Sequence, residues 1–172
     1  MHDDRTPHTD RLTGNGNPHL SGRTLADGKN SLEGGAEGAC AAFGYLRGLH
    51  ERANSIEFRL GDGNSVWFPY GWLGTVKFDP SQGLLIKFSG DLVYLVLIRG
   101  SNLDRSIEGG GIDLIRAGLQ RHRVLWVREM SEEDIRDTGE NGPTIDSIAI
   151  AEFESHSELK KWLDDEASSF SL

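Results

Sequence analysis

The chain contains a single cysteine among its 172 residues and has no long apolar run. One cysteine excludes an internal disulfide, and no stretch approaches the roughly 18 consecutive apolar residues of a membrane-spanning helix. The N-terminal residues also lack the continuous apolar centre of a signal peptide. These absences predict a cytoplasmic protein that has no membrane partner.

Motifs for catalysis and metal binding are missing as well. The sequence has no paired-cysteine pattern, no His-Glu-x-x-His motif, no nucleophile elbow and no dinucleotide-binding fingerprint. No base lies near Cys40 to activate its thiol, so we interpret this cysteine as structural. Asp62, Asp79 and Asp91 fall in predicted turns, where carboxylates cap backbone N–H groups. We therefore expect no catalytic, metal-binding or cofactor-binding residues.

Large apolar side chains are sparse at the beginning of the chain. Residues 1–37 are rich in Gly, Asn, Thr, Asp and His, a composition that predicts a disordered segment. Residues 38–130 carry 11 basic and 9 acidic side chains and are predicted to form one domain. Residues 131–172 carry 3 basic and 12 acidic side chains. Such an acidic segment solvates an exposed face, shields a basic surface of the same molecule or docks a basic partner.

Residues 55–100 show β-strand patterns separated by tight-turn chemistry. Alternating apolar residues predict strands over 56–60, 66–70 and 75–78, and apolar runs predict two more over 84–88 and 92–98. Pro69 has no N–H to donate and predicts a strand end, an edge or a bend. The 92–98 run is apolar at nearly every position, so both of its faces are predicted to be covered.

Other elements are predicted on both sides of these strands. Ala39, Ala42, Phe43, Leu46, Leu49 and Ala53 fall at helical spacing and predict an N-terminal helix. A short helix is predicted over 112–119 and a closing strand over 124–127. The acidic segment is predicted to contain a strand over 145–151 and a helix over 157–166. We therefore predict an α+β fold, with a small, strongly curved antiparallel sheet or barrel of about five to six strands.

Two clusters of side chains suggest a binding site. Trp67, Tyr70 and Trp72 surround Pro69, and strict alternation places Phe68 and Tyr70 in the core with Trp67 on the other face. Exposed aromatic side chains stack on bases or anchor a peptide, whereas buried ones cover a helix or a barrel end. The second cluster is basic and lies at the junction between the predicted helix and the closing strand. Its members are Arg116, Arg121, His122 and Arg123, with Arg99 as a possible neighbour. Arginines suit phosphate, and they also suit the C-terminal ends of helices.

The segment Leu97-Ile98-Arg99-Gly100-Ser101-Asn102-Leu103 resembles the second signature of Sm-like proteins. That resemblance implies a small barrel and an RNA contact at Arg99, although Gly83 stands where the family has its RNA-contacting asparagine. A separate pattern over residues 56–73, Leu60-x-Asp62-Gly63 followed by Val66-x-x-Pro69-x-x-Trp72-Leu73, resembles small bacterial domains of unknown function of the DUF2442 type. This second resemblance implies no catalytic residues.

Three functions follow from the sequence, in order of preference. The first is a non-enzymatic, bacterial-type interaction or adaptor module that binds a protein partner or self-associates. The second is an Sm-like RNA-binding protein, and the third is an enzyme with dispersed catalytic residues. The candidate partner-binding residues are Trp67, Tyr70, Trp72, Arg99, Asn102, Arg121, His122 and Arg123.

Overall fold

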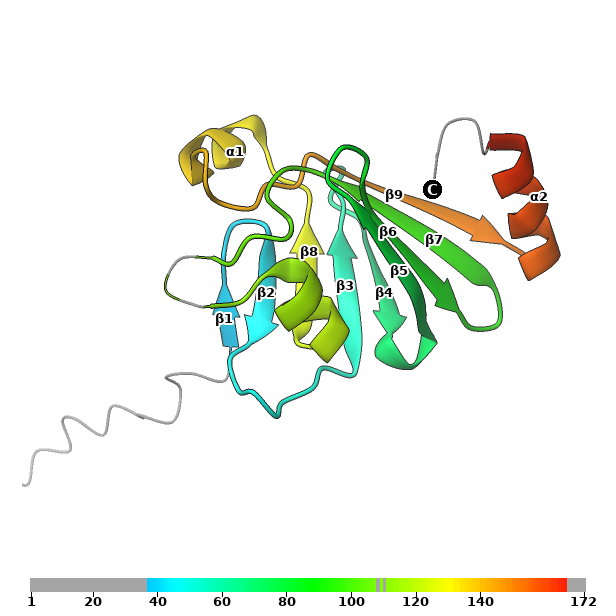
Figure 1. Ribbon diagram of the computed structural model, residues 1–172, viewed down its shortest axis with the longest axis horizontal. Coiled ribbons are helices and arrows are strands. Elements are labelled where there is room, and N and C mark those ends of the chain that lie inside the picture. The colour runs from blue at the N-terminus through cyan, green and yellow to red at the C-terminus, as the bar shows by residue number, and fades with distance from the viewer. Residues whose placement is uncertain (1–36, 108, 110, 167–172) are drawn as a thin grey trace, which may run out of the picture. The chain divides into compact units, whose positions relative to one another are not determined.

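The computed structural model describes residues 37–107, 109 and 111–166, which form two β-sheets and short helical segments (Figure 1). Sheet A has the strand order β1-β2-β8-β3-β4, and sheet B has the order β5-β6-β7-β9. Neighbouring strands are antiparallel except for β3 and β8, which are parallel. The α+β class is therefore confirmed. Glu37 opens β1, and the rest of the segment predicted to be disordered lies outside the described residues.

The nine strands of the described residues are divided between the two sheets. Sheet A contains β1 (Glu37–Ala39), β2 (Phe43–Leu46), β3 (Ser55–Arg59), β4 (Ser65–Pro69) and β8 (Val124–Arg128). Sheet B contains β5 (Leu73–Asp79), β6 (Gly83–Ser89), β7 (Val93–Arg99) and β9 (Ser147–Phe153). The helical elements are η1 (Tyr70–Trp72), η2 (Leu114–Gly118), η3 (Leu119–Arg121), α1 (Glu132–Thr138) and α2 (His156–Glu166).

The five strands predicted over residues 55–100 are present, but they belong to two different sheets. The chain leaves sheet A at Pro69, passes through η1 and enters sheet B at Leu73. Proline has no N–H for a further ladder bond, and the next N–H, of Tyr70, is bonded to the carbonyl of Asn54 at 2.9 Å. Within the described residues β4 and β5 are consequently edge strands of separate sheets. The prediction that these strands form one small curved sheet or barrel of about five to six strands is wrong, because the described residues form two sheets with nine strands.

The helix predicted over residues 39–53 is also wrong, because these residues form β1, β2 and an irregular connection. Short apolar runs fit both helical and extended periodicity, so spacing alone does not separate the two. Gly44 and Gly48 weaken a helix, whereas β2 gains a full set of partners between β1 and β8. At Gly44 the backbone lies so close to the indole of Trp126 that an added Cβ would clash with Nε1.

The segment after the strands differs in detail from its prediction. Instead of one helix over 112–119, a single π-helical turn (η2) is followed by a 3₁₀ turn (η3). The closing strand is β8, which lies in the middle of sheet A between β2 and β3. The strand that was predicted to close the sheet therefore lies in the middle of an open one.

One core cluster joins the facing surfaces of the two sheets. Phe68 of β4 stacks on Phe88 of β6 with ring centroids 4.5 Å apart, and Phe58 and Tyr94 pack around this pair. Ile112, Leu114 and Leu119 add buried side chains from the helical segment. Phe68 is 2% exposed and Trp67 is 66% exposed, which confirms the predicted alternation along β4.

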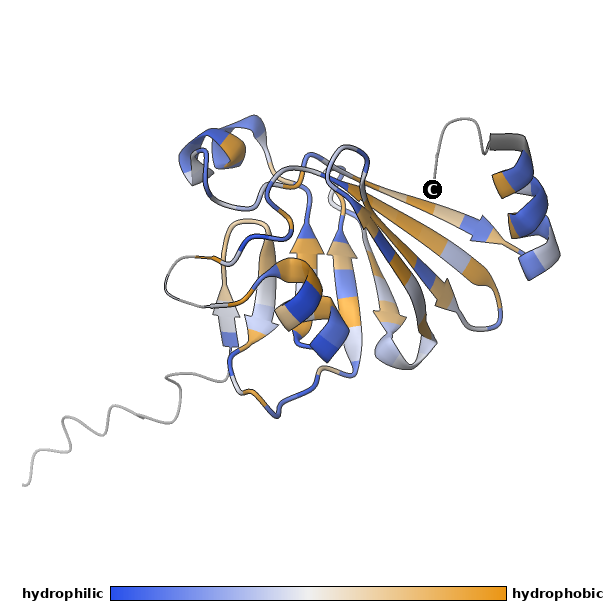
Figure 2. Ribbon diagram, in the orientation of Figure 1, coloured by the Kyte–Doolittle hydropathy of each residue, from blue (hydrophilic) through white to orange (hydrophobic). Residues whose placement is uncertain are grey.

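Strand β7 is covered on both faces, as its sequence predicts. Val96 and Ile98 belong to the core between the sheets, whereas Val93 and Leu95 pack with Phe153 and Leu159 on the other face of sheet B. Figure 2 shows this run of hydrophobic residues along β7 and the polar surface of α2. Residues after 130 are therefore part of the sheet structure, because β9 pairs with β7 over its whole length and α2 packs on sheet B.

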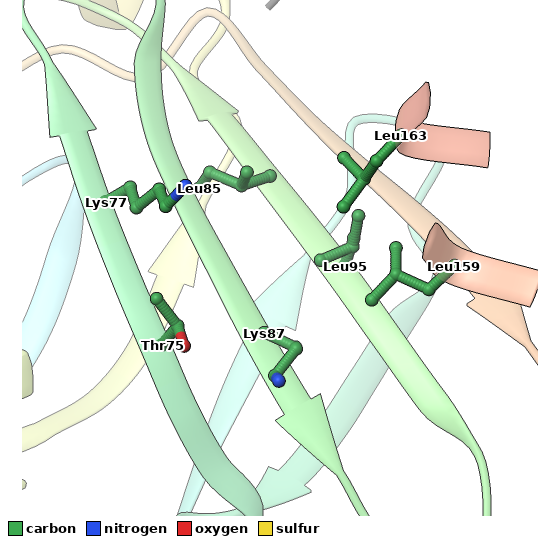
Figure 3. Close-up of a pocket in the computed structure, with 7 residues that line it drawn as sticks. All are labelled: Thr75, Lys77, Leu85, Lys87, Leu95, Leu159 and Leu163. Atoms are coloured by element: carbon green, nitrogen blue, oxygen red, sulfur yellow. The ribbon is translucent and has the colours of Figure 1, made fainter. Parts of the chain in front are cut away.

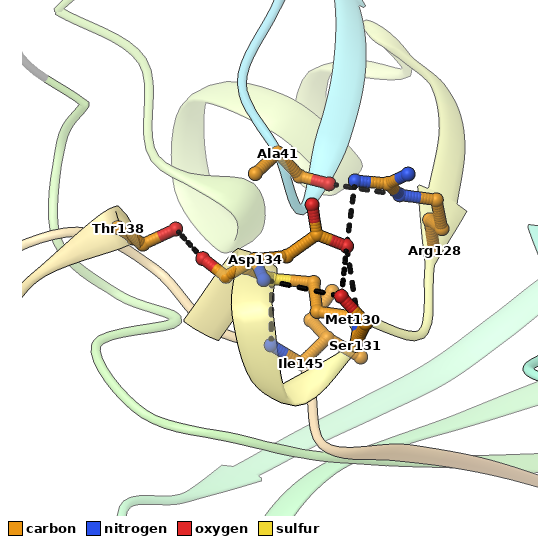
Figure 4. A network of polar contacts seen from close by, with 7 residues as sticks. All are labelled: Ala41, Arg128, Met130, Ser131, Asp134, Thr138 and Ile145. Carbon is orange, nitrogen blue, oxygen red and sulfur yellow. Dashed lines mark hydrogen bonds and ion pairs between the residues drawn. The ribbon is translucent and has the colours of Figure 1, made fainter. Parts of the chain in front are cut away.

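Helix α1 was not predicted, and side-chain contacts hold it against sheet A (Figure 4). Ser131 and Asp134 form a capping box at its N-terminus. The carboxylate of Asp134 also pairs with Arg128 at 3.4 Å, and Arg128 donates from Nε to the carbonyl of Ala41. These contacts connect α1 to β8 and to the loop between β1 and β2.

Candidate partner-binding site

The structure brings part of the aromatic cluster and part of the basic cluster together. The ring of Tyr70 stacks on the imidazole of His122, with centroids 4.6 Å apart and planes inclined by 17°. The Tyr70 hydroxyl donates to the carbonyl of Val124 at 2.9 Å, and burial raises the pKa of this phenol. This contact fixes η1, and therefore the start of β5, against the end of η3.

The helical turns η2 and η3 form a wall beside β5, and local hydrogen bonds fix where these turns begin and end. The carboxylate of Asp113 accepts hydrogen bonds from the N–H groups of Arg116 and Ala117, which starts the π-helical turn. At the other end His122 adopts the left-handed conformation, with a φ of 54°. A left-handed residue ends a helix sharply, so the chain turns directly into β8.

Between β5 and this wall lies an apolar groove of about 470 Å³, which we call the β5 groove. It is lined by Leu73, Gly74, Val76, Ile115, Leu119, Gln120 and His122. The neighbouring side chains of Arg116 and Arg121 are exposed, and no carboxylate is among the lining residues in the described part of the chain. The groove thus combines an apolar floor with basic side chains nearby, a combination that suits an apolar side chain next to an acidic one.

The strand on the other side of the groove has an open edge. Within the described residues β5 pairs with β6 alone, and its register shifts between Leu73 and Val76. A β-bulge leaves one residue of the bulged strand out of the ladder. Gly74 lies in this bulge, is exposed and has no side chain to cover its backbone. Free backbone groups therefore lie beside an apolar groove.

The remaining aromatic candidates lie elsewhere. Trp72 is half-buried, and its indole covers Gly90 so closely that a Cβ there would lie 2.5 Å from the ring. Trp67 lies on the outer face of sheet A. Its partner across the strand pair is Glu57 of β3, and Glu57 is in turn paired with Trp126 of β8. Trp72 therefore has a packing role, and Trp67 belongs to a second surface.

That second surface has paired charges. The Arg59 guanidinium lies 4.5 Å from the ring centroid of Trp126 and is 2.8 Å from the Glu57 carboxylate. The hydrogen bond from Arg59 holds the pKa of Glu57 below its ordinary range. A polar cleft of about 720 Å³ begins here and includes Arg128 and Asp134, which also pair with each other. Because these charged groups already have partners, this surface offers less to a ligand than the β5 groove.

Two more candidates from the sequence serve the fold in the structure, and a third lies exposed. Arg123 is 5% exposed and donates to the carbonyls of Leu46 and Arg47 at 2.9 and 2.8 Å. Asn102 adopts the left-handed conformation, and its amide donates to the carbonyls of Glu140 and Gly142. Arg99 is exposed at the end of β7, far along the chain from the other basic residues. The basic cluster is therefore divided, with Arg121 and His122 at the groove and Arg123 in the interior.

The outer face of sheet B has a smaller apolar hollow (Figure 3). Leu159 and Leu163 of α2 approach Leu85 and Leu95, while Lys77 and Lys87 lie on the opposite side of a volume of about 180 Å³. Thr75 and Lys77 of β5 line this hollow, whereas Leu73, Gly74 and Val76 line the β5 groove. Strand β5 therefore contributes to hollows on both of its faces.

Metal and thiol chemistry have little support in this part of the chain. Across residues 37–107, 109 and 111–166, no group of three or more His, Cys, Asp or Glu side chains is placed to hold a metal ion. Burial raises the pKa of the Cys40 thiol, which is directed toward the carbonyl of Phe43 at 3.6 Å. A raised pKa disfavours the nucleophilic thiolate, in agreement with a structural role.

The groove-lining residues on β5 and η2–η3 were not among the predicted site residues. Leu73, Ile115 and Leu119 have the spacing of ordinary core residues, and nothing in the sequence places residues 73–76 beside residues 115–122. Tyr70 and His122 were each named in one of the two candidate clusters, but their stacking is a tertiary contact that the sequence does not indicate.

The described residues thus define an α+β protein with two mostly antiparallel sheets and an apolar groove at an open strand edge. No protein-family model matches the chain, and no curated protein or solved structure matches it. None of the helices in the described residues is long and apolar enough to cross a bilayer.

Proposed function

We propose that this protein is a non-enzymatic interaction module that binds a protein partner in the β5 groove. The observation that carries the proposal is the apolar groove beside the unpaired edge of β5, with exposed arginines next to its lining residues. Burying one large apolar side chain there would contribute about 1.5–3 kcal/mol. Binding energy at protein interfaces is concentrated in a few such anchored side chains.

Charge favours a protein partner over RNA. Residues 37–166 carry 14 basic and 22 acidic side chains, so this part of the chain lacks the excess of basic side chains that is typical of RNA-binding domains. Arg123, which belonged to the predicted basic cluster, is occupied by two backbone carbonyls. The exposed Arg99 is the observation that keeps RNA binding as the second candidate function.

The two glutamines of the chain provide a matched test. Gln120 lines the β5 groove, whereas Gln82 lies in the exposed turn between β5 and β6. Gln120→Trp would fill the groove without changing the core, and Gln82→Trp makes the same change outside it. We expect proteins captured from lysate of the source cells to be retained by the unmodified chain and by Gln82→Trp. Gln120→Trp should reduce their capture about tenfold, the loss of one anchored contact.

Two results would contradict this proposal. One is the absence of any protein that is captured reproducibly; the other is equal capture by Gln120→Trp and Gln82→Trp. Copurified RNA at low salt, where phosphate contacts are strongest, decides the second candidate. RNA that is retained by the unmodified chain and lost in Arg99→Ala would favour the Sm-like hypothesis over a protein partner.

A further inference from the structure

The edge strands in the described residues differ in how open they are. Strand β1 has three residues, and the edge of β4 ends at Pro69. On β9, the N–H of Ile148 does not bond to β7 but donates to the carboxylate of Glu129. Proline and side-chain caps of this kind are ordinary protections of a sheet edge. Strand β5 has seven residues, and the N–H of its first residue, Leu73, donates to the carbonyl of Tyr70. Beyond that bond, no hydrogen bond to the free edge of β5 is found among the described residues.

The geometry beside β5 combines the two requirements for strand addition. A peptide that extends a sheet takes its affinity from main-chain hydrogen bonds and its specificity from pockets for alternate side chains. The edge of β5 provides the main-chain groups, and the wall formed by Ile115, Leu119 and His122 closes a pocket on one face. Gly74 keeps the backbone accessible where the bulge occurs.

The two faces of β5 differ in chemistry, which would make them select different side chains. Val76 and Leu73 belong to the β5 groove, where an inward-pointing side chain of an added strand would meet an apolar surface. Thr75 and Lys77 are exposed on the outer face and line the hollow that also contains Lys87 (Figure 3). Successive side chains of a strand point to opposite faces, so an added strand would place its alternate residues beside Lys77.

We infer that the partner segment is an extended peptide in which apolar and acidic residues alternate, and that it binds as an additional strand on β5. Its apolar side chains enter the β5 groove. Its acidic side chains lie beside Lys77 on the outer face, and an acidic residue at the end of the groove meets Arg121. This inference rests on the proposed function, since it specifies how the same groove is occupied.

The test uses the full chain and a displayed library of random octapeptides. Peptides are selected on the unmodified protein, and the strongest binder is synthesised as the probe. We expect the selected sequences to alternate apolar and acidic residues. The probe should bind Gln82→Trp with unchanged affinity and Gln120→Trp about tenfold more weakly. Lys77→Glu should weaken the binding of the probe. Lys160 is an exposed lysine on α2, and Lys160→Glu should leave the binding unchanged.

Backbone probes distinguish strand addition from simple occupation of a pocket. N-methylation of alternate amides removes the donors that face β5, whereas methylation of the intervening amides leaves these donors in place. One of the two methylated series should therefore lose about tenfold in affinity and the other should not. Bound probe should also slow amide hydrogen exchange at Gly74–Lys77.

The outcomes separate the inference from the proposed function. A probe that depends on Gln120 but is insensitive to both methylation series, and leaves residues 74–77 unprotected, would overturn strand addition and leave groove binding intact. Equal binding to Gln120→Trp and Gln82→Trp, or the selection of no peptide, would overturn both. A dimer of the protein alone that dissociates in Gln120→Trp would assign the groove to a second copy and overturn the partner peptide.

Discussion

Arg121 and Arg123 are two residues apart, yet the fold gives them unrelated environments. Arg121 is exposed beside the β5 groove, whereas Arg123 is 5% exposed and its guanidinium donates to the carbonyls of Leu46 and Arg47. His122 separates them in the left-handed conformation, which reverses the direction of the chain. A cluster that is continuous in sequence is therefore divided between a surface and the interior.

This division predicts different stabilities for two matched variants. Arg123→Met retains much of the side-chain volume but leaves two backbone carbonyls without their donor, so unfolding should become easier by about 2–3 kcal/mol. Arg121→Met makes the same change at the surface and should stay within about 0.5 kcal/mol. Urea unfolding of the two variants measures the difference. Equal midpoints would contradict the structural role of Arg123.

The same contrast exists between neighbouring aromatic residues. Strand alternation correctly separates Phe68 in the core from Trp67 on the outer face, because both side-chain directions follow from local geometry. Alternation does not indicate that Tyr70 stacks on His122, a residue 52 positions later. For single residues, the sequence therefore predicts the face of the strand on which a side chain lies, but not the residues that it contacts.

Among the elements, helix α1 shows how a short helix depends on its cap. Ser131 donates its backbone N–H and its hydroxyl to the Asp134 carboxylate, and these bonds hold the pKa of Asp134 below its ordinary range. A lowered pKa in the folded state means that the contribution to stability is complete above the pKa of the unfolded chain. This contribution is lost as the pH falls through the folded-state pKa.

We therefore expect α1 to loosen in acid before the sheets unfold. The amide signals of residues 132–138 should shift toward disordered values as the pH falls below about 4, near the ordinary pKa of aspartate. Asp134→Asn should remove most of this pH dependence, because its side chain does not titrate. Asp137→Asn removes the same charge from the same helix outside the capping box and should keep the transition. An NMR titration with the same midpoint in all three proteins would exclude the capping box as its cause.

Prediction of elements was most successful where hydrophobic alternation and turn residues agree. Strands β3–β7 follow such signals, and the continuous apolar run of β7 correctly indicates burial on both faces. Residues 39–53 were misassigned because Ala42, Phe43 and Leu46 fit helical spacing as well as an extended strand. The deciding contact is the pairing of β2 with β8, which lies about 80 residues away along the chain. Local secondary-structure propensities do not predict such a pairing.

At the level of the whole molecule, Glu129 connects the two sheets. Its carboxylate accepts hydrogen bonds from the N–H of Gly61, just after β3 in sheet A, and from the N–H of Ile148 in β9 of sheet B. Each of its two oxygens thus holds the backbone of a different sheet. The contact adds a polar link to the aromatic core that already joins the sheets.

Because Glu129 bonds to both sheets, replacing its carboxylate by an amide should lower the free energy of unfolding. In Glu129→Gln one oxygen remains as an acceptor, but the NH₂ group would face the second backbone N–H, so stability should fall by about 1–3 kcal/mol. Glu152→Gln makes the same change at an exposed position of β9 and should have little effect. Urea denaturation provides the comparison, and a Glu129→Gln midpoint equal to that of Glu152→Gln would argue against the link.

The sequence by itself determined the α+β class, the strands over residues 55–100 and the alternation along them, since these depend on side-chain period and turn residues close in the chain. Tertiary structure alone decided that the strands divide into two sheets at Pro69, that β8 lies between β2 and β3, and that β5 borders a groove. The physical reason is distance along the chain. Residues 73–76 and 115–122 meet because the whole fold brings them together, and no local signal encodes that meeting.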